Sequence, residues 1–332
     1  MALKDGKRVL VFIAGVIAVY ALVKLLAMTG FLNPYWLRIL DQALIMTIGA
    51  LGLSVIFGIS GQFSIGHAAF FGIGAYSAGL VTKSLGGDPF TFLLALATGA
   101  FMAGLVAFLI GLPVLRLTSD YLGIATLGFG IIVKVGFDNA NKVIPEMGGA
   151  TGMTGIPQVA NFEWIFIFCI LSIVLARNLV QSGHGRACTA LREDEVAANV
   201  VGINIFRYKM LAFVFGCTLA GLAGALYAHR YPFLHPSSFD FLPSIDFLII
   251  VVLGGMGSLT GTIVTAIGWV FLLEGLRTVL GSTFVDYRGV IYALLLIIVI
   301  LVRRQGIFGN KEYGFLAPVV RRKEGRNATI ES

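Results

Sequence analysis

Residues 90–112 read FTFLLALATGAFMAGLVAFLIGL, a run without a single charged side chain. About 20 apolar residues in an α-helix cross the hydrocarbon core of a bilayer, so this stretch predicts a membrane span. The rest of the chain has the same character. Of its 332 residues 58% are hydrophobic and 12% are charged, and its mean hydropathy is +0.92. Soluble domains carry about 25% charged residues. The composition therefore argues against a water-soluble protein and predicts one integral membrane unit.

Ten apolar runs lie along the chain, and each predicts a helix that crosses the membrane. They fall at about residues 9–29, 39–58, 63–82, 90–112, 119–136, 162–181, 210–229, 241–255, 261–281 and 289–302. Three are weak as lipid-facing spans, because one contains Lys134, one contains His67, and the run at 241–255 is short. Protein or water must satisfy such polar groups. The sequence predicts an all-α, polytopic membrane protein with about ten transmembrane helices, some of them short or interrupted.

Basic residues concentrate at both ends of the chain and in one central loop. Lys4, Lys7 and Arg8 precede the first run, and Arg303, Arg304, Arg321, Arg322 and Lys323 follow the last. Cytoplasmic flanks carry an excess of Lys and Arg, so both termini are expected in the cytoplasm. Ten spans then place the loop at 182–209 inside and the loop at 137–161 outside. The net charge of +7 is interpreted as topology, so no nucleic-acid partner is expected.

The expected domain organisation follows from this count. Residues 1–8 form a cytoplasmic N-terminus, residues 9–302 form a single transmembrane domain in contact with membrane lipid, and residues 303–332 form a cytoplasmic tail.

The sequence offers no catalytic constellation. It contains no G-x-S-x-G elbow, no H-E-x-x-H motif and no G-x-x-x-x-G-K-[ST] phosphate loop. Cys169, Cys188 and Cys217 have no histidine at metal-ligand spacing and no close cysteine, so they are expected to be packing residues. We therefore expect no catalytic residue, no metal site and no cofactor in this chain.

The central loop contains a predicted short helix at 187–201, which Gly202 is positioned to end. Arg192, Glu193 and Glu195 give this helix a charged face, and Asp194 interrupts its apolar stripe. Two interpretations remain open: the helix docks on a second protein, or it packs on its own protein.

The predicted outer loop holds the run GGATGMTG at 148–155. Its Gly149, Thr151 and Gly152 are candidates for a substrate entrance, although a partner contact or a plain surface turn fits the same residues.

Among the charged residues inside the predicted spans, four are expected to face the bundle, an interface or water, because charges are costly in hydrocarbon. They are Asp41, Lys134, Glu274 and Arg277. Glu274 and Arg277 are three residues apart and can pair. His67 is either hydrogen-bonded within the bundle or in contact with a substrate.

Five segments resemble one known family. They are FGISGQFSIGHAAFFGIGAY at 57–76, GGATGMTG at 148–155, ALREDE at 190–195, VVLGGMGS at 251–258 and RRQGIF at 303–308. In this order they resemble the M-type permease subunits of bacterial branched-chain amino acid ABC importers.

The resemblance implies a non-catalytic, multi-pass subunit of the bacterial inner membrane. Its partners would be an H-type permease subunit, two cytoplasmic ATPase subunits that bind ATP and Mg, and a periplasmic substrate-binding protein. The central loop would then dock on an ATPase. The residues that the family pattern assigns to this coupling are Ala190, Leu191, Arg192, Glu193, Asp194, Glu195 and Gly202.

The resemblance also suggests where a substrate passes, because interrupted helices of transporters expose backbone groups at their breaks. The candidate residues of the path are Ser64, Gly66, His67, Gly254, Gly255, Gly257 and Ser258. Branched-chain or other neutral amino acids are the expected substrates, and urea or short amides are the alternative. An ion-coupled secondary transporter is a more distant alternative, which the near absence of paired carboxylates in the spans argues against.

Overall fold

A computed structural model describes residues 2–29, 33–117 and 119–280, together with Tyr287, Val290, Leu294, Ile297, residues 306–309, Glu312 and Leu316. The predicted span at 289–302, apart from isolated positions, and most of the predicted tail at 303–332 lie outside these residues. The part that is described is almost entirely helical.

The long helices follow the predicted apolar runs closely. In chain order they are α1 (Ala2–Met28), α2 (Pro34–Leu53), α3 (His67–Leu85), α4 (Pro89–Val114), α5 (Ser119–Asp138), α6 (Phe162–Gln181), α9 (Ile205–Arg230), α10 (Phe241–Gly254) and α11 (Leu259–Leu280). Shorter elements join them: the π-helix η1 (Ser54–Ile59), the helices α7 (Gly183–Glu193) and α8 (Glu195–Val200), and the 3₁₀ turns η2 (Ala140–Lys142), η3 (Pro145–Met147), η4 (Gly149–Thr151) and η5 (Pro236–Phe239). The strands β1 (Met153–Thr154) and β2 (Phe233–Leu234) pair antiparallel.

Seven helical stretches in the described residues are long and apolar enough to cross a membrane. They are Pro34–Ile59, Pro89–Val114, Tyr121–Asp138, Phe162–Gln181, Ile205–Arg230, Pro236–Gly254 and Leu259–Thr278. The helix α3 is not among them, and most of its residues are buried between other helices, so it does not need a lipid-facing composition. The polytopic all-α prediction is therefore confirmed, whereas the count of about ten spans and the cytoplasmic termini stay predictions.

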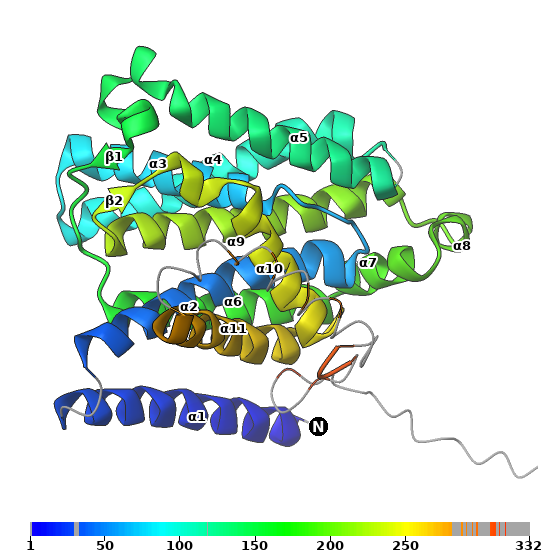
Figure 1. Ribbon diagram of the computed structural model, residues 1–332. Helices are drawn as coiled ribbons and strands as arrows, with labels where there is room; N and C mark the ends of the chain where they lie inside the picture. The colour runs from blue at the N-terminus through cyan, green and yellow to red at the C-terminus, as the bar shows by residue number, and fades with distance from the viewer. Residues whose placement is uncertain are drawn as a thin grey trace, which may run out of the picture.

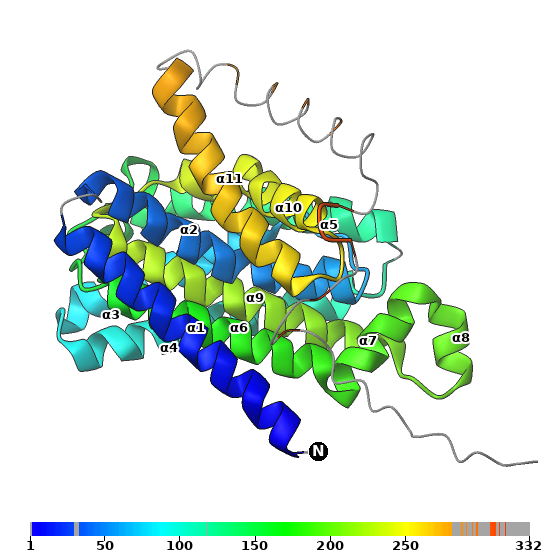
Figure 2. The ribbon, with the colours of Figure 1, turned by 90° about the horizontal axis from the view of Figure 1, so that it is seen from below.

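The helix α9 lies in the middle of the bundle, against α2, α3 and α4 (Figures 1 and 2). Glycines allow these close crossings. A Cβ atom at Gly224 of α9 would lie 1.8 Å from the carbonyl oxygen of Phe71, and one at Gly74 of α3 would lie 2.1 Å from the carbonyl oxygen of Gly221. Membrane helices pack through such small residues because lipid gives no hydrophobic drive for their association.

The helix α1 lies along the outside of the bundle in both views (Figures 1 and 2). Lys24 of α1 donates a hydrogen bond to Glu163 at the start of α6, which connects α1 to the bundle. The bundle has two distinct ends: α7 and α8 project from one, which we call the α7–α8 end, and the strands lie at the other, which we call the β1–β2 end (Figure 1).

Two helix interruptions, one after η1 and one after α10, meet near the α7–α8 end. Residues 60–66 separate η1 from α3, and residues 255–258 separate α10 from α11. A Cβ atom at Gly58 would lie 3.0 Å from the amide nitrogen of Gly257, and the hydroxyl of Thr262 donates to Ser54 over 3.2 Å. The sequence predicted both interruptions, and the fold places them side by side.

Candidate functional site

The central loop forms two helices rather than one. The prediction of a continuous helix at 187–201 is wrong, because the chain breaks at Asp194. The carboxylate of Asp194 accepts hydrogen bonds from the amides of Val196 and Ala197, at 2.8 and 3.0 Å, and so caps the N-terminus of α8. The predicted end at Gly202 is confirmed: its φ is +87°, and its amide bonds to the carbonyl of Asn199 over 2.9 Å.

The candidate coupling residues divide into inward and outward groups. Leu191 is buried and Ala190 is half-buried, whereas Glu193, Asp194, Glu195 and Gly202 are exposed. Glu195 pairs with Lys209 at the start of α9.

The guanidinium of Arg192 turns inward. It donates a hydrogen bond of 2.7 Å to the carbonyl oxygen of Gly58 in η1, and it also pairs with Glu193 at 2.7 Å. The backbone of Gly61, whose φ is +72°, packs directly on Arg192, since a Cβ atom there would lie 3.0 Å from the Cγ of Arg192. Arg192 therefore connects α7 to the first interrupted helix.

Three exposed valines, of which the sequence analysis noted only Val201 as part of an apolar helix face, cover the tip of the loop. Val196, Val200 and Val201 are 75%, 82% and 75% exposed. The three valines lie within six residues of one another, in and directly after α8, so the signal is local in the sequence. Apolar side chains gathered at an exposed tip are typical of an interaction surface.

A cavity of about 460 Å³ opens at the α7–α8 end. Arg177, Arg186 and Arg192 contribute charge to its wall, and Ile59 and Gly257 bring the two helix interruptions to it. The structure thus places a candidate coupling residue, Arg192, beside a candidate path residue, Gly257.

A carboxylate outside the spans caps α11 at the same cavity. Glu312 accepts hydrogen bonds from the amides of Leu259 and Thr260 and from the Thr260 hydroxyl. Burial raises the pKa of Glu312, and these hydrogen bonds oppose that rise.

The remaining candidates for the path are packed inside the bundle. His67 is fully buried, and its Nε2 lies 2.9 Å from the carbonyl oxygen of Gly49, which supports the interpretation of a histidine bonded within the bundle. Ser64 is 1% exposed, and its hydroxyl has no hydrogen-bond partner among the described residues. A Cβ atom at Gly66 would lie 2.2 Å from the carbonyl oxygen of Thr126 in α5.

The second interruption is equally compact. A Cβ atom at Gly254 would lie 2.7 Å from the carbonyl carbon of Gly261, and one at Gly306 would lie 2.6 Å from the backbone of Gly255. The hydroxyl of Ser258 accepts a hydrogen bond of 3.0 Å from the amide of Gly261. A role of these residues in transport stays a prediction.

The candidates for the outer entrance form an ordered turn at the β1–β2 end. A Cβ atom at Gly152 would lie 2.6 Å from the carbonyl oxygen of Leu234, so this glycine allows β1 to approach β2. Gly149 is buried against Asn141, and the exposed Thr151 donates a hydrogen bond of 2.7 Å to the carbonyl of Gly148. Their role as an entrance stays a prediction.

Charged residues of the candidate spans form ion pairs, both between helices and within one helix. Asp41 of α2, 1% exposed, pairs with Arg230 of α9 at 2.6 Å, a contact that the sequence analysis missed. The predicted pair of Glu274 and Arg277 is confirmed, with 3.6 Å between the charged atoms.

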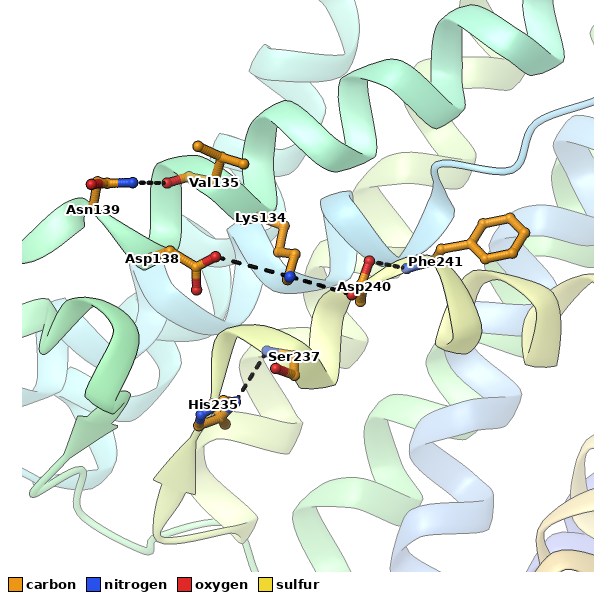
Figure 3. Close-up of polar contacts among 8 residues, drawn as sticks. All are labelled: Lys134, Val135, Asp138, Asn139, His235, Ser237, Asp240 and Phe241. Carbon is orange, nitrogen blue, oxygen red and sulfur yellow. Dashed lines mark hydrogen bonds and ion pairs between the residues drawn. The ribbon is translucent and has the colours of Figure 1, made fainter. Parts of the chain in front are cut away.

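Lys134 of α5 has two carboxylates as partners. Its ammonium lies 3.5 Å from the carboxylate of Asp240 and 4.0 Å from that of Asp138, and it points from α5 toward the start of α10 (Figure 3). Asp240 in turn accepts a hydrogen bond of 2.7 Å from the amide of Phe241, the first residue of α10 (Figure 3).

Comparison with known proteins identifies the family. Residues 35–300 match the family described as branched-chain amino acid transport system / permease component. The chain is 35% identical to the high-affinity branched-chain amino acid transport system permease protein LivM of Escherichia coli, over 80% of this chain and 68% of that protein. It is 33% identical to LivM of Salmonella typhimurium, over 81% of this chain and 69% of that protein. It is 30% identical to BraD of Pseudomonas aeruginosa, over 79% of this chain and 91% of that protein.

No solved structure matches the chain. The family match covers most of the sequence, and it confirms the resemblance of the five segments quoted above. The chain therefore belongs to the family of branched-chain amino acid transport permease components.

Proposed function

We propose that this chain is a transmembrane subunit of a binding-protein-dependent ABC importer in the bacterial inner membrane, and that the importer carries branched-chain amino acids. The observation that carries the proposal is the hydrogen bond between Arg192 and Gly58 in a member of this permease family. It connects an exposed, apolar-tipped loop to a break in a membrane helix. An importer driven by a separate ATPase needs such a connection.

In this proposal the α7–α8 end faces the cytoplasm, as do both termini. The basic residues Arg186, Arg192, Arg207 and Lys209 at that end support this orientation. The partners are an H-type permease subunit, two ATPase subunits that hold ATP and Mg, and a periplasmic binding protein that delivers the substrate.

The coupling step follows from the contacts. When the ATPases close on ATP, they push on Val196, Val200 and Val201 of α8. Because Arg192 is bonded to Gly58, the push reaches the first interruption, and through Gly257 it reaches the second. The helices α6 and α9, on either side of the loop, move with it.

Reconstitution tests this function directly. The chain is co-expressed with the four partner proteins, and the purified complex is placed in liposomes. ATP-dependent uptake of labelled leucine supports the proposal. ATP-dependent uptake of urea without leucine uptake assigns the same importer to urea, and uptake by this chain without any ATPase overturns the ABC assignment.

A variant pair tests the coupling tip. Val200→Ser is expected to lower leucine uptake at least about tenfold, because it places a hydroxyl in an apolar contact with the ATPase. Val143→Ser is the matched control: Val143 is 84% exposed at the β1–β2 end, where no ATPase docks in this proposal. Uptake by Val200→Ser equal to that of the unchanged protein would exclude the valine tip as the coupling surface.

A further inference from the structure

The helix α5 is the least buried of the seven candidate spans in the described residues. Only 22% of its most apolar window is buried, compared with 67% for α9. Nevertheless α5 carries Lys134, whose side chain is 31% exposed, and the partner carboxylates of Asp138 and Asp240 are 33% and 39% exposed. Figure 3 shows the three charged groups together, between the last turns of α5 and the start of α10.

All three residues of this cluster belong to segments that are long and apolar enough to cross a membrane. Lys134 and Asp138 lie in the candidate span Tyr121–Asp138, and Asp240 lies in the candidate span Pro236–Gly254. The hydroxyl of Ser244, one turn further along α10, accepts a hydrogen bond of 3.0 Å from Ala68 at the start of α3. The cluster thus adjoins the first helix interruption.

Three charges within candidate membrane spans, each about one third exposed, do not face lipid, because charged side chains in hydrocarbon are costly. This face of α5 therefore borders water or another polar surface. Beside the cluster is a crevice lined by Ile65, Leu127, Ile131 and Phe241, with Asp240 and Ser244 at its polar side. Its volume of about 10 Å³ has room for about one water molecule, so this conformation is closed to an amino acid.

We propose that Lys134 and Asp240 form a binding site for the charged groups of a zwitterionic amino acid on the translocation path. The carboxylate of the substrate takes the place of Asp240 as partner of Lys134, near the positive N-terminal end of α10. Asp240, released from Lys134, binds the substrate ammonium group. The aliphatic side chain of the substrate lies against Ile65, Leu127 and Ile131. The inference rests on the proposed importer function and deepens it, since urea carries no charge to exchange with this ion pair.

Uptake by reconstituted variants tests the ligand. Lys134→Met and Asp240→Asn are each expected to lower leucine uptake at least about tenfold at saturating loaded binding protein, because each removes one charge-assisted contact. Lys134→Arg keeps the charge and is expected to retain uptake. Lys142→Met is the matched control, because Lys142 is exposed nearby and bonds only to Asn139 among the described residues. Normal uptake by Lys134→Met would overturn the proposal.

A second measurement separates a binding site from a structural ion pair. In the double variant Lys134→Asp with Asp240→Lys the ion pair is present with its polarity reversed. We expect this variant to assemble, as judged by size-exclusion chromatography, and to fail in leucine uptake. Recovered uptake would show that the pair only holds α5 against α10, and would overturn the proposal.

Thiol labelling tests the face of α5 independently of transport. In the assembled complex, Lys134→Cys is expected to react with a membrane-impermeant methanethiosulfonate reagent. Ile132→Cys, on the opposite side of α5, is not. The native Cys169, Cys188 and Cys217 are buried, which keeps the background low.

The labelling result also distinguishes the two possible failures. No labelling at Lys134→Cys overturns the site whatever the complex transports. If Lys134→Cys is labelled but the wild-type complex imports no amino acid, this face of α5 is in contact with water, yet the proposed substrate and its binding at Lys134 are both wrong.

Discussion

The helices α9 and α5 are both apolar enough to cross a membrane, yet the protein uses them differently. Most of the apolar window of α9 is buried, and its Arg230 meets a fully buried Asp41. Little of α5 is buried, and its Lys134 meets carboxylates that are about one third exposed. A buried pair has no room to change partners, whereas a half-exposed one does. The contrast separates a helix that holds the fold from one suited to handle a substrate.

Breaking the buried pair should have the largest effect on stability. Arg230→Met leaves the carboxylate of Asp41 buried without its partner, which costs about 3–5 kcal/mol. We expect a large fall in the thermal unfolding midpoint of the purified protein in detergent. The double variant Arg230→Met with Asp41→Asn should recover part of the loss, and a midpoint that does not change in the single variant would contradict the structural role of α9.

A methyl group at the central crossing should have the next largest effect. In Gly224→Ala the new Cβ lies 1.8 Å from a backbone oxygen of α3, so the two helices must separate. Overpacking of this kind costs about 1–3 kcal/mol. We expect a lower yield of monodisperse protein in size-exclusion chromatography. An unchanged yield would show that α9 and α3 are packed less closely at Gly224 than the structure has them.

Removing the charge from α5 should barely change stability. Partly exposed ion pairs contribute about 0–1 kcal/mol, so Lys134→Met should unfold close to the wild-type midpoint. Together with the loss of uptake expected above, this outcome would sharpen the distinction between the two helices. If Lys134→Met lost as much stability as Arg230→Met, the distinction between α5 and α9 would no longer hold.

The smallest effect is expected at Gly128 of α5, where, apart from the neighbouring residues and backbone of α5 itself, no described atom lies within 4 Å of the position of a Cβ atom. Gly128→Ala should be neutral, or should stabilise the helix by up to about 1 kcal/mol through the lower backbone entropy of alanine. The thermal unfolding midpoints of Gly128→Ala and Gly224→Ala are measured side by side. The substitution is the same, but Gly128 has free space beside it and Gly224 lies against the backbone of α3.

Local features of the chain could be predicted well. The span at 162–181 coincides with α6, and the end of the loop helix at Gly202 was found, because run length and a C-terminal glycine are properties of neighbouring residues. The break at Asp194 is also a local effect, since Asp is a favoured N-cap. Helical periodicity across 187–201 concealed it.

Contacts between distant segments could not be predicted. No spacing in the sequence relates Arg192 to Gly58, Asp41 to Arg230, or Lys134 to Asp240, because each pair joins helices whose relative positions depend on packing. His67 illustrates the limit: the sequence identified it as a polar residue in a span, and only the packing of α2 against α3 gave it the carbonyl of Gly49 as a partner.

The sequence by itself determined a helical membrane protein, seven stretches that are apolar enough to cross a membrane, two helix interruptions, and, through five segments, its family. These follow from hydrophobicity, capping and chain-local geometry, which act between near neighbours. The tertiary structure alone decided that the interruptions meet, that the loop contacts one of them through Arg192, and that Lys134 of α5 faces Asp240. Such contacts depend on glycine-mediated helix crossings, which bring together residues more than a hundred positions apart.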